Sequence, residues 1–356
     1  MKLLILAPYP INHAPSQRFR FEQYIPFLKE NGVEVEIAGF LNQKTWSILY
    51  NPGHVLQKGL GLFKGLIKRL FIPYRKYDAV LIHREAALIG PPITEWFIAI
   101  VFRKPIIFDF DDSIWLPNYS EANKFWRWLK QPQKTAYIIQ KSMLVLAGNT
   151  YLSNYAAKYN ANIKIIPTTI DTEYHSKSKK NKNDKIIIGW TGSSTTTEHV
   201  YVIQSVITNI LNKYPHKIDF VFISNHHINI PGVINKPWKR ETEISDLTQF
   251  DIGIMPLPDN EWTRGKCGFK GLQYMSLEIP TIMSPVGVNK EIIKHGINGF
   301  LANTPEEWEN TLSQLIENQS LRENLGKEAR NTIKTKYSVE ALKQEYLSLM
   351  KSIITK

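Results

Sequence analysis

A pair of lysines in a glycine-rich stretch of this 356-residue chain could bind phosphate groups. Lys266 and Lys270 lie on either side of Gly268, shortly after the buried apolar run Ile252–Met255. A buried strand that ends in a glycine-rich loop and enters a helix presents free backbone amides at the helix start. Such amides attract anions, and nearby lysines add positive charge. The stretch therefore predicts a diphosphate site with Lys266 and Lys270 at the start of the helix.

A second loop of small residues could also approach a phosphate closely. It starts at Gly189, where the apolar run 185–190 ends, and includes Gly192 and Ser193. Their amides and hydroxyl are accessible because no large side chain stands in the way. A glycine-serine loop without any ligand remains the alternative. Arg240 follows Pro237 and Trp238 and could supply further positive charge.

Several polar residues in the first half of the chain follow expected strands. His83 comes directly after the run 79–82, so we expect it at the carboxyl edge of a sheet. Ser16 and Arg18 follow the first strand, where Ser16 could cap a helix and Arg18 could reach a phosphate. Asp112 ends the acidic run 109–112 and is expected at a helix start, where carboxylates are favoured.

The same acidic run has a second interpretation. An Asp-x-Asp pair can hold a divalent metal that carries a nucleotide diphosphate, because hard cations prefer carboxylate oxygens. That arrangement would need a single nucleotide-binding domain, and the elements described next argue for two. We therefore expect no metal site, and a role for Asp112 in binding an acceptor stays open.

The elements that must position these residues alternate between strands and helices. Short runs that are apolar on both faces are the expected strands of a first domain: 3–7, 33–38, 79–82, 105–110, 143–147 and 163–166. The alternation restarts with further runs: 185–190, 220–223, 252–255 and 281–283. Buried strands separated by helical stretches favour parallel sheets covered on both faces. The sequence therefore predicts an α/β chain with two doubly wound, Rossmann-like domains.

A polar stretch marks the expected boundary between these domains. Residues 176–184 contain no apolar side chain and are expected to form an exposed linker between domains 1–175 and 185–337. Periodic apolar residues predict an amphipathic helix over 338–356 that packs back on the first domain. Because open parallel sheets bind ligands at the carboxyl ends of their strands, we expect the two domains to face each other across a ligand cleft.

Composition narrows the possible classes of protein. With 43% hydrophobic and 12% aromatic residues, the chain is neither disordered nor collagen-like, and a single cysteine excludes an intramolecular disulfide. Lys and Arg outnumber Asp and Glu by 44 to 32, which indicates an anionic partner. The apolar start of the chain is too short for a signal peptide, and no run is long enough to span a bilayer. No Gly-x-Gly-x-x-Gly follows a first strand, which argues against a dehydrogenase.

The segment 42–77 is a basic amphipathic stretch with seven Lys or Arg residues and no acid. Such a segment suits the surface of an anionic membrane. The alternative, which fits equally well, is a helix that packs its apolar face on the sheet and holds its lysines in water. Nucleic-acid binding is not expected, because no recognised reading motif is present.

The order of motifs in the second half resembles a known family. Lys270 begins a Lys-x-x-Gln-Tyr-Met-Ser run, which is followed by Ile-Pro-Thr-Ile-Met-Ser over 279–284 and Asn-Gly-Phe-Leu over 298–301. This order resembles the C-terminal domain of retaining glycosyltransferases of family 4, which have the GT-B fold. The resemblance implies transfer of a hexose from a nucleotide diphosphate sugar to a glycan or lipid-linked acceptor, in the synthesis of a cell-surface polysaccharide or glycolipid. It implies no metal or cofactor, and a cytoplasmic protein, peripheral on the inner face of the membrane.

The resemblance also assigns expected roles to particular residues. Lys270 would contact the diphosphate, and His83 would lie beside the donor sugar. The family has two glutamates eight positions apart, near the sugar and the ribose, and here Gly265 and Gln273 stand at those positions. Gln273 can still form hydrogen bonds with a ribose diol, whereas Gly265 offers no side chain. Because both glutamates are missing, a catalytically idle nucleotide-sugar-binding protein or partner subunit is an alternative, as is an epimerase of the same architecture.

Overall fold

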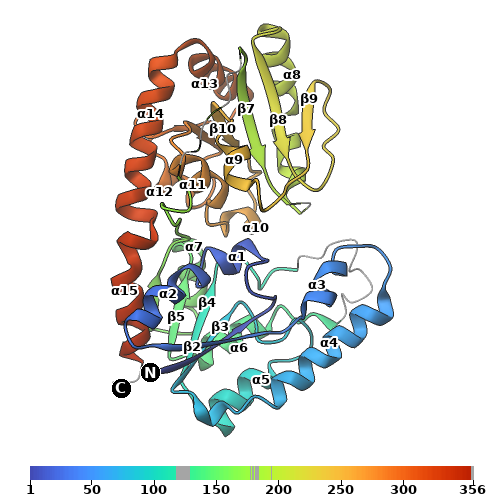
Figure 1. Ribbon diagram of the computed structural model, residues 1–356, viewed down its shortest axis with the longest axis vertical. Helices are drawn as coiled ribbons and strands as arrows, with labels where there is room; N and C mark the ends of the chain where they lie inside the picture. The colour runs from blue at the N-terminus through green and yellow to red at the C-terminus, as the bar shows by residue number, and fades with distance from the viewer. Residues whose placement is uncertain (118–128, 177, 179, 181–183, 194, 354–356) are drawn as a thin grey trace. The chain divides into compact units, whose positions relative to one another are not determined.

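The computed structural model describes residues 1–117, 129–176, 178, 180, 184–193 and 195–353. The chain folds into two compact domains (Figure 1). The first domain consists of Met1–Thr168 and Leu342–Lys356, and the second consists of Thr169–Ala341. The division therefore precedes the stretch 176–184 that we expected to be the linker. Residues 177, 179 and 181–183 of that stretch, and 354–356 of the expected C-terminal helix, lie outside the described residues.

The first domain is built on a parallel sheet in the strand order β2-β1-β3-β4-β5-β6. Its strands are β1 (Lys2–Ala7), β2 (Glu34–Gly39), β3 (Ala79–His83), β4 (Ile106–Phe110), β5 (Leu144–Ala147) and β6 (Ile163–Ile165). The central strands are buried on both faces, which is why they appear in the sequence as unbroken apolar runs. All six lie where the apolar runs predicted them, with bounds that differ by one or two residues.

Helices and helical turns connect these strands. They are α1 (Pro15–Arg18), η1 (Glu22–Tyr24), α2 (Ile25–Glu30), α3 (Gln43–Ile48), α4 (Val55–Leu70), η2 (Tyr74–Lys76), α5 (Ile93–Trp96), η3 (Phe97–Val101), α6 (Lys134–Lys141) and α7 (Thr150–Ala156). Asn42 and Asn149 cap α3 and α7 by accepting hydrogen bonds from Thr45 and Leu152, respectively. Among the described residues, no helix is long and apolar enough to cross a membrane.

The second domain contains a parallel sheet in the order β12-β11-β10-β7-β8-β9. Its strands are β7 (Ile186–Thr191), β8 (Ile218–Ile223), β9 (Val233–Lys236), β10 (Ile252–Met255), β11 (Thr281–Met283) and β12 (Phe300–Leu301). The outer strands β9 and β12 were not predicted. Both are short, and β9 alternates between half-buried and exposed residues, so neither forms a continuous apolar run.

The helices of the second domain complete the doubly wound arrangement. They are η5 (Thr197–Ile203), α8 (Gln204–Lys213), α9 (Glu243–Leu247), α10 (Glu261–Arg264), α11 (Phe269–Ser276), α12 (Asn289–Ile292), α13 (Pro305–Glu317), α14 (Gln319–Thr332) and η6 (Ile333–Tyr337). The last helix, α15 (Val339–Ser352), begins in this domain and continues into the first. Apolar residues of β7, β8, β10, α8 and α13 form one core cluster that includes Trp190 and Trp308.

The helix α15 contributes residues to the first domain, although it is last in the chain. The ring of Tyr346 stacks on the ring of Tyr24, with centroids 4.2 Å apart and planes 8° from parallel. The Lys343 ammonium lies 4.9 Å from the ring centroid of Phe27. Both Tyr24 and Tyr346 are buried, so the end of the chain completes the core of the first domain.

Candidate active site

The topology of the second sheet brings two loops to one point. The chain proceeds outward from β7 to β8 on one side and from β10 to β11 on the other, while β7 and β10 are neighbours. The carboxyl ends of two such strands form a topological switch point, where doubly wound sheets bind ligands. The loop that includes Gly192 and Ser193 leaves β7 here, and the segment 256–268 leaves β10 here. Both stretches that were expected to bind phosphate therefore follow the strands that flank the switch point.

The two lysines of this domain lie near tryptophan rings. Lys270 is the second residue of α11, and its Nζ is 5.6 Å from the ring centroid of Trp190 on β7. The Nζ of Lys266 is 5.1 Å from the centroid of Trp262. Lys266 is not part of the helix start, as we had expected, but lies in the loop between α10 and α11. The reason is Gly268, which adopts φ +69° and is the N-cap of α11. The helix therefore begins at Phe269, and Lys266 precedes it.

His199 is a member of this site that sequence reasoning missed. It lies in η5 directly after the glycine loop, and its Nδ1 is buried without a hydrogen-bond partner among the described residues. Burial, together with the charges of Lys270 and Lys266, lowers the pKa of His199 to about 3. Both lysines thus place positive potential on the loop after β7. No local pattern could have identified this histidine, because its neighbours in space come from a segment about 70 residues later in the chain.

The backbone near Gly192 is too crowded for a side chain. A Cβ at Gly192 would lie 2.4 Å from the Trp190 ring and 2.6 Å from Thr196 Oγ1. The Gly192 amide donates a hydrogen bond to the carbonyl of Ile223, and the hydroxyl of exposed Ser193 lies 3.0 Å from Thr195 Oγ1. Ser193 therefore has a group that a ligand can reach, whereas the Gly192 amide already has a partner in this structure.

Tyr274 connects the two halves of this site. It lies on α11, and its hydroxyl accepts a hydrogen bond of 2.8 Å from the Thr191 amide at the end of β7. This contact requires Gly253 on β10, since a Cβ there would lie 2.5 Å from the Tyr274 ring. Tyr274 thus fixes the helix that carries Lys270 relative to the loop that carries Gly192.

Gln273 is placed differently from our expectation. Gln273 is only 2% exposed, and its Nε2 lies 3.4 Å from His175 Nε2 and donates to Glu243 Oε1 at 3.4 Å. A side chain with these partners is a buried contact of the domain, not an open ribose ligand. Sequence reasoning missed Glu243 and His175, because both are distant from Gln273 along the chain. Arg240 is exposed in the segment between β9 and α9.

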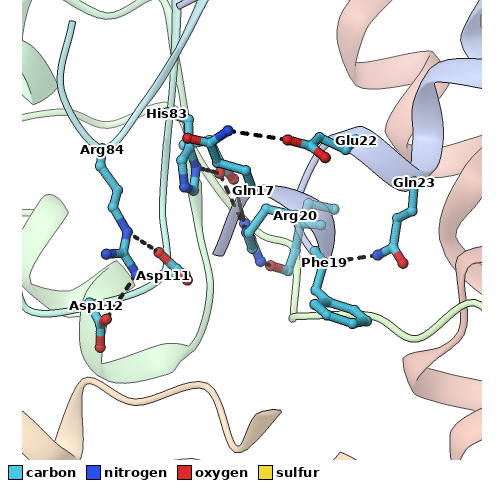
Figure 2. A network of polar contacts seen from close by, with 11 residues as sticks. Gln17, Phe19, Arg20, Glu22, Gln23, His83, Arg84, Asp111 and Asp112 are labelled. Carbon is cyan, nitrogen blue, oxygen red and sulfur yellow. Dashed lines mark hydrogen bonds and ion pairs between the residues drawn. The ribbon is translucent and has the colours of Figure 1, made fainter. Parts of the chain in front are cut away.

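In the first sheet the switch point lies between β1 and β3, which are neighbours in the order β2-β1-β3-β4. His83 is the last residue of β3 and is fully buried. Its Nδ1 lies 2.7 Å from Asp109 Oδ2, and Arg20 Nη2 lies 2.5 Å from Asp109 Oδ1 (Figure 2). Burial acts to raise the pKa of Asp109, but Arg20 and His83 outweigh it and hold this pKa at about 2. Asp109 is therefore an ionised carboxylate between two buried donors.

This contact fixes the hydrogen-bonding role of His83. An ionised carboxylate can only accept, so a neutral His83 must carry its proton on Nδ1 and keep a lone pair on Nε2. Nε2 is buried and has no partner among the described residues. His83 was expected at a sheet edge open to a ligand. The structure instead encloses it, with the ring of Phe21 at a centroid distance of 5.5 Å.

Arg84 holds the acidic residues that follow β4. Its Nε is 2.6 Å from Asp111 Oδ1, and its Nη2 is 2.9 Å from Asp112 Oδ2 (Figure 2). Asp112 was expected at a helix start, but no helix begins there, and it is an ion-pair partner of Arg84. Arg84 adopts φ +60°, a strained conformation for a residue with a side chain. Strain of this kind is common at functional sites.

The segment after β1 is held by a second set of contacts (Figure 2). Gln17 accepts a hydrogen bond from the Tyr9 amide at 2.8 Å and donates to Glu22 Oε1 at 3.1 Å. Ser16 lies inside α1, whose N-cap is Ala14, so Ser16 does not cap the helix. Arg18 ends α1 and is largely buried, with its guanidinium carbon 5.0 Å from the Phe19 ring centroid. Within the described part of the chain, no group of three His, Cys, Asp or Glu residues is placed to hold a metal ion.

Comparison with known proteins identifies a family region in the second domain. Residues 260–332, which include Lys266, Lys270 and Gln273, match the family model described as glycosyl transferases group 1. No curated protein sequence matches the chain.

Solved structures share the fold of the whole chain at low sequence identity. Sucrose-phosphate synthase from Thermosynechococcus elongatus matches with a TM-score of 0.73 at 11% identity, covering 100% of both chains. HepE from Anabaena, solved with UDP and glucose, matches with a TM-score of 0.66 at 12% identity, covering 99% of this chain and 100% of that chain. A glycosyltransferase from Rickettsia africae matches with a TM-score of 0.69 at 13% identity, covering 99% of this chain and 98% of that chain.

These likenesses establish two Rossmann-like domains of the GT-B type. The expected fold class is thereby confirmed, and the family match lies in the domain whose switch point carries the lysines. The chain therefore has the GT-B fold, and its second domain contains a region, residues 260–332, that is similar to the glycosyl transferases of group 1.

Proposed function

We propose that this protein is a glycosyltransferase that transfers a hexose from a nucleoside diphosphate sugar to a glycan or lipid-linked acceptor, with retention of anomeric configuration. The observation that carries the proposal is the positive potential at the switch point of the second sheet. Lys270 lies against Trp190 of β7, and burial, followed by the charges of Lys270 and Lys266, lowers the pKa of His199 in η5, so an anionic diphosphate is the natural ligand for this position. The HepE structure that shares the fold was solved with UDP and glucose, which supports a nucleotide-sugar donor.

In the proposed reaction, the acceptor hydroxyl oxygen bonds to the anomeric carbon on the face from which the diphosphate departs. The bond between the anomeric carbon and the phosphate oxygen breaks, and the acceptor proton passes to that departing oxygen. Lys270 and the loop at Ser193, whose hydroxyl a ligand can reach, stabilise the charge that develops on the diphosphate. The scheme uses no protein nucleophile and no metal ion, and the nucleotide sugar is a co-substrate.

We place this activity on the cytoplasmic side of a membrane, in the synthesis of a cell-surface polysaccharide or glycolipid. A chain whose charged residues are predominantly basic suits contact with phosphorylated or otherwise anionic acceptors. Because Gly265 and Gln273 stand where the family has glutamates, a nucleotide-sugar-binding protein without turnover is the competing proposal. Gln273 donates a hydrogen bond to Glu243, so a buried carboxylate does lie next to one of the two positions where the family has a glutamate.

A thermal-shift panel of nucleoside diphosphates and their sugars, followed by a transfer assay, tests the proposal. A ligand at 100 times its Kd should stabilise the protein by about 2.7 kcal/mol. Retention would be read from the anomeric configuration of the product by NMR. Sugar binding without transfer to any of a broad set of acceptors would support the idle binding protein instead. Conversion of the donor sugar without an acceptor would support an epimerase.

We also predict a role for His83 in turnover. Replacing His83 with Ala should lower the rate of transfer by roughly 10-fold or more, while the affinity for nucleoside diphosphate stays unchanged. The reason is that the resemblance places His83 near the donor sugar, where His83 and Asp109 form a buried pair at the end of β3, and that His83 lies in a different domain from Lys270.

The matched control for this variant is His227→Ala, which removes an exposed histidine of the second domain. Steady-state kinetics with a verified acceptor would measure both variants, and circular dichroism would check that they fold. If His83→Ala turns over at the wild-type rate, His83 serves only to pack the end of β3.

A further inference from the structure

Helix α4 presents its large apolar side chains to solvent. Leu56 is 83% exposed, and Phe71, directly after the helix, is 82% exposed. Four further exposed apolar residues continue from Leu56 at intervals of three or four positions and form one stripe along the helix: Leu60, Phe63, Ile67 and Leu70. The opposite side of the helix, which faces the domain, consists mostly of small or basic residues: Lys58, Gly61, Leu62, Gly65 and Arg69. The orientation is thus the reverse of an ordinary surface helix.

The glycines and the buried arginine hold α4 in this orientation. A Cβ at Gly61 would lie 2.3 Å from Thr45 Oγ1, and one at Gly65 would lie 2.8 Å from the carbonyl oxygen of Phe40. Arg69 donates hydrogen bonds to the carbonyls of Ala86 at 2.7 Å and Ala7 at 2.9 Å. The helix could not turn its apolar stripe inward without losing these bonds and creating those clashes. The alternative that α4 packs its apolar face on the domain holds for Leu62 and Leu66, which join a core cluster with Phe40, but not for the exposed stripe.

A second helical segment lies near the C-terminal end of α4 and also exposes apolar residues. In α5 and η3, Trp96 is 44% exposed, and three further apolar residues are also exposed: Ile93, Ile100 and Val101. The inner sides of both helices meet at one peptide, since Ala86 accepts from Arg69 and its amide donates to Glu95 Oε1 at 3.1 Å. Figure 1 shows α4 and α5 next to each other in the first domain. Together, α4 and α5–η3 form what we term the two-helix surface.

The charge at this surface has one sign. Lys64 and Lys68 are exposed along the edge of the apolar stripe, and Arg75 and Lys76 are exposed just beyond the helix. No acidic residue occurs between 42 and 77, and Glu95 of the second helix is buried. Lys58 and Arg69 are also buried, so they do not contribute to the exposed charge.

We infer that the two-helix surface docks on an anionic lipid bilayer. Apolar side chains flanked by lysines fit the boundary between acyl chains and headgroups, where the apolar groups insert and the ammonium groups contact anionic lipids. A bilayer suits this surface better than a folded protein partner does, because the surface combines a broad apolar stripe with unopposed positive charge along its edge. The docking itself is independent of the proposed function. Its benefit, access to a lipid-linked acceptor, rests on that function.

Co-sedimentation with vesicles tests the inference directly. The full chain should pellet with vesicles of phosphatidylcholine and phosphatidylglycerol, and not with phosphatidylcholine alone. Because each basic residue near an anionic surface contributes roughly a fivefold change in affinity, Lys64→Glu with Lys68→Glu should weaken binding by roughly 30-fold or more. Lys327→Glu with Lys334→Glu makes the same change in net charge on exposed residues of the second domain and should leave binding intact.

The apolar part of the surface has separate tests. Phe63→Ser should reduce vesicle binding while preserving the fold, because the side chain is already exposed. Brominated acyl chains should quench the fluorescence of the wild-type protein more than that of Trp96→Phe, which would show that Trp96 enters the bilayer. Every variant should bind nucleoside diphosphate as the wild type does, so a failure of the proposed function would be seen separately.

Three results would overturn the inference. The first is wild-type protein that stays in the supernatant with anionic vesicles even at low salt, where the attraction is strongest. The second is pelleting that survives both the lysine reversal and Phe63→Ser. The third is a dimer in solution that Phe63→Ser dissociates, which would assign the two-helix surface to a second copy of the chain.

Discussion

Replacing Asp109 with Ala is expected to lower the free energy of unfolding by about 3–5 kcal/mol. The carboxylate is buried and accepts from Arg20 and from His83, both of which are also buried. Its removal leaves a guanidinium without its charge partner inside the domain, which costs far more than the ion pair itself contributes. Urea denaturation followed by circular dichroism would measure the loss.

Asp259→Ala provides the matched control. Asp259 forms an ion pair with Arg264 at 2.6 Å, but both side chains are about half exposed, so its loss should cost less than about 1 kcal/mol. If the two variants lose equal stability, the buried pair has no special role in the first domain.

The same carboxylate predicts a dependence of stability on acid. The pKa of Asp109 is held at about 2 in the folded protein, which is below its value in an unfolded chain. The native state therefore binds fewer protons than the unfolded state in this range. The stabilisation from Asp109 is complete above about pH 4 and is lost as the pH falls through about 2. Asp109→Ala should remove this part of the acid sensitivity, which denaturation curves between pH 2 and pH 5 would show.

The second large effect is expected at Lys270. Lys270→Ala should weaken binding of nucleoside diphosphate by roughly 10- to 150-fold, the equivalent of about 1.5–3 kcal/mol for a charge-assisted contact. Binding of the free nucleoside should hardly change, since it has no phosphate to contact. Calorimetric titration of UDP and uridine into both proteins would separate the two effects.

Lys290→Ala serves as the control for Lys270→Ala. Lys290 is an exposed lysine of the same domain on the helix α12, and its removal changes the net charge by the same amount. Equal affinities of Lys270→Ala and the wild type for UDP would remove Lys270 from the donor site. Equal losses in both variants would show that only the overall charge of the domain matters.

Central strands could be predicted from the sequence because burial on both faces leaves an unbroken apolar run. The run 252–255, for example, became β10 with the same bounds. The outer strands β9 and β12 could not be predicted, since β9 alternates between half-buried and exposed residues and β12 is only two residues long, so neither carries such a run. The orientation of α4 could not be predicted from the sequence either. Its glycine contacts with Thr45 and Phe40 arise only once the helix has packed on the domain.

The candidate site was predictable where the chemistry lies within one segment. The lysines and the loop at Gly192 could be located because a strand, a glycine-rich loop and a helix occur in succession. Contacts between distant segments could not. Asp109 with Arg20, and Gln273 with Glu243, join residues between 30 and 89 positions apart. Their pairing depends on which strands become neighbours, and composition and periodicity do not determine that order.

The return of α15 to the first domain has a consequence for how the protein is made. Tyr24 is synthesised early, yet the ring that covers it, Tyr346, is added only near the end of translation. At a rate of synthesis of ~5–20 residues per second, part of the core of the nascent first domain stays exposed to solvent for roughly tens of seconds. Folding of this domain therefore cannot finish while the ribosome is still making the second domain. A ribosome-bound chain that ends before residue 342 should thus expose Tyr24 to proteases and chaperones that the released protein escapes.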